Sequence, residues 1–137
     1  MNSKISFQEE VLNLLSRIIK EQHNDSRIAL PLYKETRFVR PDDIIRCEAA
    51  NNYTWFYLVD GEKIIISKGL YEYSGILEGK GFIRCHQSHL VNKKYVLSLH
   101  RDDHIHELKA IDGSLVPVSR SKVDAIHKAF SDLHNFG

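Results

Sequence analysis

The stretch Phe82-Ile-Arg-Cys-His86-Gln-Ser88-His-Leu-Val-Asn92 and the later stretch Asp112-Gly-Ser-Leu-Val-Pro-Val-Ser119-Arg120 carry the most informative pattern in the chain. In each, a short apolar strand ends abruptly in small polar and cationic side chains. Such ends place hydrogen-bonding groups on loops held by a rigid sheet, where recognition residues are common. Glutamine and arginine can pair bidentately with adenine and guanine edges in a major groove. The pattern therefore predicts a module that binds duplex DNA, and not an enzyme.

The overall composition is that of a globular protein. The chain has 137 residues, of which 42% are hydrophobic and 27% charged, so we expect one domain with a short appendage. No apolar run approaches the roughly 18 residues that span a membrane, and residues 1–10 lack the apolar core of a signal peptide. The two cysteines make no disulfide framework. We therefore expect a cytoplasmic protein with no membrane partner.

Charge is distributed unevenly along the chain. Residues 1–79 carry ten Lys/Arg against twelve Asp/Glu, a balance of −2. Residues 80–128 carry nine Lys/Arg against five Asp/Glu, a balance of +4, and Asp132 brings the total to +1. The basic excess lies in the segment that contains both polar strand ends, which favours a one-sided contact with phosphates.

Residues 1–26 are expected to form an N-terminal linker helix ahead of a domain that spans residues 27–137. Ser6 and Glu9 have the spacing of a capping box. Apolar residues then recur at helical spacing on one face of residues 6–22: Phe7, Val11, Leu14, Leu15, Ile18 and Ile19. This face either packs on the domain's own core or serves as a connector or dimer helix, and the sequence leaves both interpretations open.

From residue 27 onward the pattern changes to short strands. Strand character is seen at residues 28–33, 37–40, 44–49, 53–59, 62–67, 82–85, 95–100, 104–111 and 115–118. A hairpin turn is expected at Asp60-Gly61 and a short helix at residues 70–78. Ser121 with Asp124 is expected to cap a C-terminal helix with the inward face Val123, Ile126, Phe130 and Leu133. These segments predict a mainly β fold of antiparallel sheets with short helices and a helix at each terminus.

Four segments, in order over about a hundred residues, resemble the LytTR family of bacterial DNA-binding domains. They are residues 43–58 (Asp-Ile-Ile-Arg-Cys-Glu-Ala-Ala-Asn-Asn-Tyr-Thr-Trp-Phe-Tyr-Leu), 67–70 (Ser-Lys-Gly-Leu), 81–92 with its His-x-Ser-x-x-x-Asn run, and Pro-Val-Ser-Arg at 117–120. The resemblance covers residues 28–127. It implies an elongated set of small antiparallel sheets that contacts double-stranded DNA with loops.

The resemblance also implies which side chains face DNA. The base-contacting residues would be Asn52, Tyr53, Gln87 and Arg120. Separately from the resemblance, phosphate contacts suit the ring donor, hydroxyls and cations of His86, Ser88, Lys93, Lys94, Ser119, Ser121 and Lys122. Gln87 occupies a position where other members often carry Arg, Lys or Asn, so the preferred base is open.

Several of these residues have simpler interpretations. His86 and Ser88 could cap the end of their strand, and Arg120 could pair with Asp124 on a helix surface. Asn92 is expected to form a turn, because asparagine bonds its own backbone readily.

Two rival chemistries remain from the residues alone. Two possible metal clusters are His86 with His89, and His104 and His106 with His100, but no paired Cys or acidic partner completes a zinc site. Cys47 and Cys85 lie in strands that could be adjacent, which leaves a redox-sensing disulfide open. The alternative function is therefore a metal-binding or redox-sensing β domain without DNA binding. Neighbouring Cys85 and His86 point to opposite faces of a strand, which argues against a catalytic pair, and we expect no cofactor.

The family usually forms the output half of two-component response regulators. The resemblance therefore implies transcription regulation, with a sensor histidine kinase acting indirectly through a receiver domain that this chain is too short to contain. It also implies a dimer on DNA at repeated promoter sites.

Overall fold

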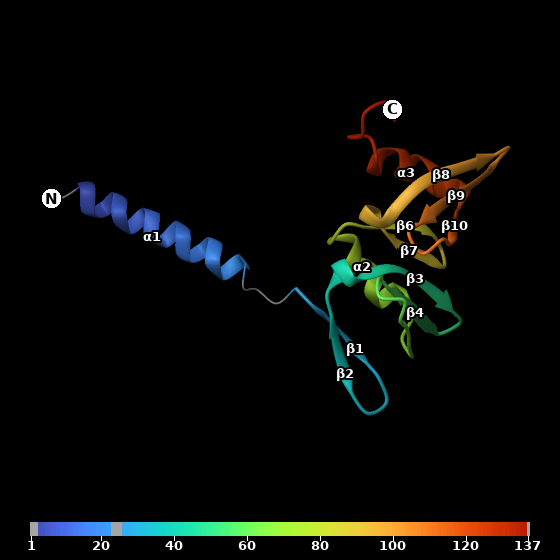
Figure 1. The fold of residues 1–137 in the computed structure, drawn as a ribbon, viewed down its shortest axis with the longest axis horizontal. Helices are drawn as coiled ribbons and strands as arrows, with labels where there is room; N and C mark the ends of the chain where they lie inside the picture. Colours follow the sequence, from blue (N-terminus) through green and yellow to red (C-terminus); the bar gives the residue numbers. More distant parts are fainter. Residues whose placement is uncertain (1–2, 23–25, 137) are drawn as a thin grey trace.

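The computed structural model describes residues 3–22 and 26–136. Within them, ten strands form three antiparallel sheets (Figure 1). A hairpin joins β1 (Ile28–Pro31) to β2 (Thr36–Val39), a five-stranded sheet has the order β5-β4-β3-β7-β6, and a three-stranded sheet has the order β10-β9-β8. The mainly β fold predicted from the sequence is confirmed.

The five-stranded sheet consists of β3 (Ile44–Ala50), β4 (Tyr53–Leu58), β5 (Lys63–Ile66), β6 (Phe82–His86) and β7 (His89–Asn92). The 3₁₀ turn η1 (Pro41–Asp43) precedes β3, and α2 (Tyr71–Glu78) links β5 to β6. The predicted turn at Asp60-Gly61 is confirmed. Gly61 has a φ of +92°, a backbone conformation that would be strained in a residue with a side chain. The predicted helix at residues 70–78 is confirmed as well.

Strand β7 lies in a segment where the sequence pattern predicts no strand. Only Leu90 and Val91 are apolar in it, and both are fully buried. Because these two neighbours face opposite sides of the sheet, neither an alternating pattern nor a long apolar run marks the strand.

The β6–β7 hairpin contributes to two separate cores. Leu90 and Phe82 pack in a cluster with the β1–β2 hairpin, α2 and one face of the five-stranded sheet. Val91 and Cys85 pack in a second cluster with the three-stranded sheet and α3. That sheet contains β8 (Val96–Asp102), β9 (Ile105–Ala110) and β10 (Leu115–Val118), and α3 spans Val123–Ala129. Each fully buried aliphatic side chain contributes about 1.5–3 kcal/mol, so the hairpin is held from both sides.

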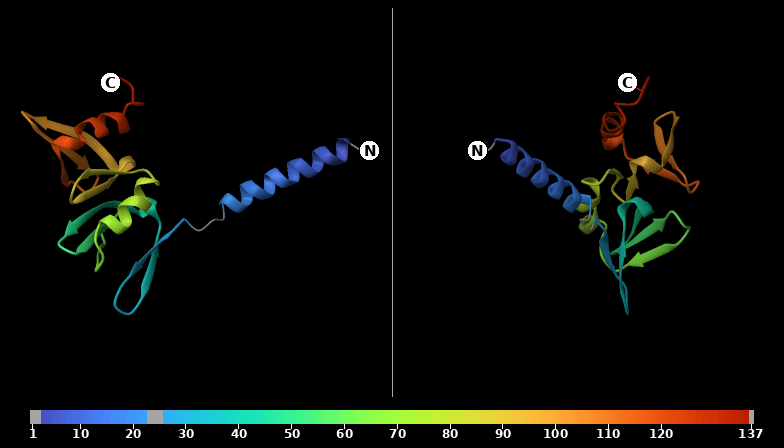
Figure 2. Two further views of the ribbon diagram at one scale, coloured as in Figure 1. Left: turned by 180° about the vertical axis from the view of Figure 1, so that it is seen from behind. Right: turned by 60° about the vertical axis from the view of Figure 1, so that its left-hand side comes forward.

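The N-terminal helix α1 spans Ser3–Gln22. Because it begins at Ser3, Ser6 lies inside the helix and its predicted capping box with Glu9 is wrong. The side chains of residues 6–19 are all exposed, so this part of α1 does not pack on the core, and both views in Figure 2 show it apart from the sheets. Packing of its apolar face on the domain's own core is therefore excluded, and its interpretation as a connector or dimer helix remains.

The C-terminal helix also differs from the prediction at its start and end. Residues Arg120–Lys122 form the 3₁₀ turn η3, and α3 begins at Val123 without a side-chain cap, so Ser121 does not cap it. Ile126 and Phe130 are buried as predicted. The helix ends at Ala129, however, and Leu133 remains 54% exposed.

Candidate nucleic-acid interface

Three polar loops that are far apart in sequence meet at one edge of the molecule. They are the β3–β4 tip (residues 51–53), the β6–β7 turn (residues 86–88) and the segment after β10 (residues 119–121). The backbone N–H of Ala49 donates to the carbonyl of Ser88 at 2.8 Å, which ties the first loop to the second. The N–H of Ser119 donates to the carbonyl of Cys85 at 2.9 Å, which ties the second to the third. We call these three loops the interface edge.

The β3–β4 tip is a tight turn with two exposed recognition candidates. Asn51 has a φ of 57°, the left-handed conformation that asparagine tolerates better than most residues. Thr54 is buried, and its hydroxyl donates to the carbonyl of Lys68 at 2.7 Å. Between these two fixed points, Asn52 and the 48% exposed Tyr53 present their side chains at the tip.

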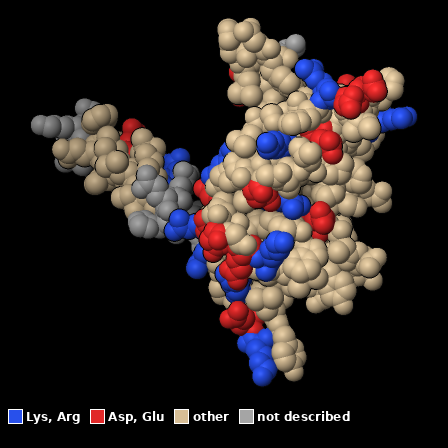
Figure 3. All heavy atoms as spheres, turned by 45° about the vertical axis from the view of Figure 1, so that its right-hand side comes forward, with Lys and Arg blue, Asp and Glu red and all other residues tan. Residues whose placement is uncertain are grey.

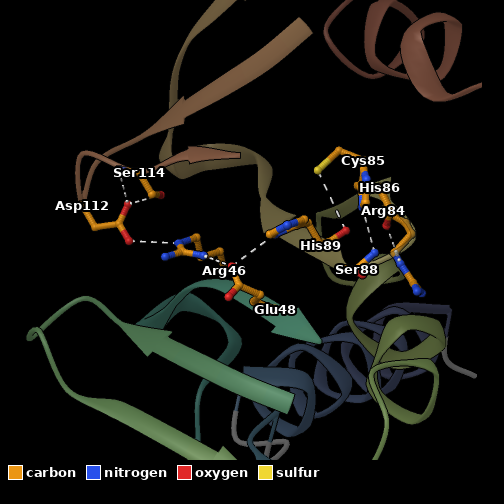
Figure 4. Close-up of polar contacts among 9 residues, drawn as sticks. All are labelled: Arg46, Glu48, Arg84, Cys85, His86, Ser88, His89, Asp112 and Ser114. Carbon is orange, nitrogen blue, oxygen red and sulfur yellow. Dashed lines mark hydrogen bonds and ion pairs between the residues drawn. The ribbon is translucent and has the colours of Figure 1, made fainter. Parts of the chain in front are cut away.

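The β6–β7 turn is braced by a side chain that the sequence analysis did not assign. The Arg84 guanidinium donates to the carbonyl of His86 at 3.0 Å (Figure 4). It also donates to the carbonyl of Gln87. The His86 Nδ1 accepts a hydrogen bond from the Ser88 N–H at 3.0 Å. This supports the strand-end capping interpretation of His86. The exposed Gln87 side chain therefore projects from a turn whose backbone is held on both sides.

Arg120 is exposed at the junction between β10 and α3. It lines an open hollow of about 360 Å³ together with His104, His106 and Val123. Within the described part of the chain, no ion pair joins Arg120 to Asp124, so that interpretation of Arg120 is wrong. The guanidinium is thus available to a ligand at the interface edge.

The structure does not bring Lys93 and Lys94 to this edge. Both follow β7 at the end opposite to the Gln87 turn, in the 3₁₀ turn η2 (Lys93–Tyr95). Their ammonium groups lie 3.6 Å from Asp132 and 2.9 Å from Asp42, respectively. Asn92 is buried, and its side-chain oxygen accepts a hydrogen bond from the Lys94 N–H at 3.3 Å, which supports its predicted role in a turn.

A polar network behind the interface edge links the two larger sheets (Figure 4). Arg46 on β3 donates to Asp112 in the β9–β10 turn at 3.1 Å and to Glu48 at 3.3 Å. Burial acts to raise the pKa of Asp112, but hydrogen bonds from Ser114 and Arg46 outweigh it and lower the pKa. Arg46 was not predicted, although an arginine among the apolar residues of a predicted strand is a signal that the sequence contains.

His89 completes this network on the side of the β6–β7 turn. Its buried Nδ1 lies 3.7 Å from a Glu48 carboxylate oxygen and has no hydrogen-bond partner among the described residues. Its ring packs edge-on against that of His86 at a centroid distance of 5.3 Å. Burial lowers the pKa of His89 despite the opposing effect of Glu48, so this ring favours the neutral form.

One face of the molecule carries charges of both signs. On the face drawn in Figure 3, Lys and Arg side chains are interspersed with Asp and Glu instead of forming one continuous basic area.

The rival chemistries find no support in the geometry. Among residues 3–22 and 26–136, no group of three or more His, Cys, Asp or Glu side chains is placed to hold a metal ion. Cys47 on β3 and Cys85 on β6 are both free, β7 separates their strands, and they belong to different cores. The possible disulfide between adjacent strands is therefore wrong. Burial raises the pKa of Cys85 to about 12, which makes the thiol a poor nucleophile.

The chain combines small antiparallel sheets with three polar loops at one edge. Residues 34–131 match the model of the LytTr DNA-binding domain family, and the chain belongs to this family. It is thus a DNA-binding domain of a regulator, in a family of DNA-binding domains and not of enzymes.

The fold resembles a solved LytTr domain of Bacillus cereus, which is described as part of a methyl-accepting/DNA response regulator. The similarity has a TM-score of 0.67 at 23% sequence identity and covers 78% of this chain and 98% of that one. No curated protein matches the chain. Within the described ranges, no helix has the length and apolar character needed to cross a membrane.

Proposed function

We propose that the chain recognises a specific sequence in double-stranded DNA, with the loops of the interface edge in the grooves. The observation that carries this proposal is that backbone hydrogen bonds at or beside three loops hold them together at one edge, where they expose polar side chains. We assign Asn52, Tyr53, Gln87 and Arg120 to base edges. The amide of Gln87 suits adenine, and the guanidinium fork of Arg120 suits guanine.

Phosphate contacts would flank these base contacts and set the register of the domain on the duplex. We assign them to His86, Ser88, Ser119, Ser121 and Lys122, which lie in or beside the same loops. The phosphate contacts of Lys93 and Lys94 stay a prediction, since both are ion-paired away from the edge.

The Bacillus cereus domain belongs to a response regulator, which supports the same setting for this chain. We infer that residues 27–137 act as an output domain in the cytoplasm, and that residues 1–26 form the linker to a receiver domain. A sensor histidine kinase would act through that receiver, and the output domain would bind repeated promoter sites as a dimer.

Selection from a randomised duplex pool tests the recognition of DNA. We expect one sequence motif to be enriched, and fluorescence anisotropy on that motif should show affinity that falls steeply as salt rises. Absence of both enrichment and salt-sensitive binding would contradict the proposal. Stoichiometric zinc in the purified protein would instead support the metal-binding alternative.

A further inference from the structure

Helix α1 carries an apolar stripe that no other described part of the chain covers. Phe7, Val11, Leu14 and Ile18 are 65%, 38%, 51% and 41% exposed. Their spacing of four, three and four residues is that of the a and d positions of a heptad repeat, which forms the seam between paired helices. A stripe of this kind in water marks an interaction surface.

We propose that α1 pairs in antiparallel orientation with α1 of a second copy of this chain. If the two helices are related by an axis between Leu12 and Asn13, Phe7 lies opposite Ile18 of the second copy and Val11 opposite Leu14. Both halves of the stripe are then covered in one symmetric arrangement. Each layer pairs two different apolar residues, so the seam is continuous over the four positions.

The charges beside the stripe favour the antiparallel orientation. Glu10 and Arg17 are exposed and share one flank, seven residues apart. At a rise of about 1.5 Å per residue they lie roughly 10 Å apart along the helix, too far to pair within one copy. The antiparallel arrangement places Glu10 beside Arg17 of the second copy, twice by symmetry. A parallel pair would instead place Glu10 beside the apolar Leu15.

Sedimentation of the full chain without DNA tests the pairing. We expect a monomer–dimer equilibrium that depends on protein concentration, and a monomer for Leu14→Glu at the same concentrations. Circular dichroism and thermal melting of the sheets should be unchanged in this variant, because its side chain is exposed and lies outside both cores. A wild-type chain that stays monomeric, or that forms a tetramer, overturns the proposal.

Charge reversal tests the orientation. Glu10→Lys and Arg17→Glu should each weaken the dimer about fivefold, since each replaces two exposed attractions with two repulsions. The double variant Glu10→Lys/Arg17→Glu should recover the wild-type dissociation constant. Glu9→Lys is the matched control, because Glu9 is also exposed but lies on the helix face opposite the stripe. Equal effects of Glu9→Lys and Glu10→Lys, or no recovery in the double variant, overturn the antiparallel arrangement.

The pairing of α1 would provide the interface of the dimer in the proposed function, and in this respect it rests on that function. The sedimentation test, however, does not depend on DNA binding. Dimerisation is measured without DNA, and binding of a single site by the loops is measured separately. A monomeric chain that still binds the selected site would contradict the helix pairing alone.

Discussion

At the scale of single residues, side-chain chemistry separates the residues in and beside the interface edge into two groups. Gln87 projects from a turn whose carbonyls are already bonded, and Arg120 leads out of a strand into a 3₁₀ turn. Both have planar groups that match base edges. Lys122 has a flexible stem and a point charge that suits a phosphate of any sequence. Substitution of Gln87 or Arg120 should therefore change base preference, whereas substitution of Lys122 should change affinity for all sequences alike.

Arg120→Ala is expected to cost about 1–3 kcal/mol on the selected site and to relax the choice at one base pair. Gln87→Ala should do the same at a different base pair. Lys122→Ala should weaken binding to all sequences alike and reduce the salt slope by about one. The measurement is the affinity of each variant for every single-base variant of the site. Lys80→Ala, at the other end of β6, is the control, and wild-type ratios in Arg120→Ala would refute its base role.

The buried thiols provide a second prediction at this scale. Since burial raises the pKa of Cys85 to about 12, almost no thiolate is present near neutral pH. Neither Cys85 nor Cys47 should react with a thiol reagent in the folded protein, and both should react in denaturant. Rapid labelling of either cysteine in the native state would show that the strands open locally.

At the scale of elements, the β6–β7 hairpin contributes both to the two hydrophobic cores and to the candidate site. Its strands lie in both cores, and its turn forms the middle loop of the interface edge. Arg84 is the side chain that connects these roles, because it holds the two carbonyls of the turn from within β6. The position of Gln87 thus depends on a residue that need not touch DNA.

Arg84→Ala is expected to weaken binding to the selected site by about 1–3 kcal/mol, as two hydrogen bonds from a charged group are lost. Arg84→Lys retains the charge but cannot bond both carbonyls with one fork, so it should behave like the alanine variant. Specificity profiles would show whether the loss is concentrated at the base pair assigned to Gln87. Wild-type binding by Arg84→Lys would mean that only the charge matters.

At the scale of the whole molecule, the Arg46–Asp112 ion pair joins β3 of the five-stranded sheet to the β9–β10 turn of the three-stranded sheet. Because the folded-state pKa of Asp112 is lowered, its contribution to stability is present above its unfolded pKa and disappears as pH falls through the folded pKa. Asp112→Asn should lower the free energy of unfolding at pH 7 by about 0.5–1 kcal/mol, because solvent screens this exposed ion pair. Urea unfolding of both proteins should show this difference shrinking below about pH 4. A difference that stays constant down to pH 3 would contradict the ionic role.

The sequence by itself determined the elements that depend on local chemistry. The hairpin at Gly61 needs a left-handed residue, and β4 alternates buried side chains with more exposed ones. The polar strand ends at Gln87 and Arg120 were also visible, because a change from apolar to polar residues is a local signal. These features decided the mainly β fold and the loops of the candidate site.

Only the tertiary structure decided how those pieces meet. Strand β7 is stabilised by its two neighbouring strands and by two cores, so its own residues carry little local pattern. The separation of Cys47 from Cys85 follows from strand order, and the bracing by Arg84 and Arg46 follows from side-chain packing. The physical reason is that pairing between distant strands depends on long-range register and burial, which a short stretch of sequence does not contain.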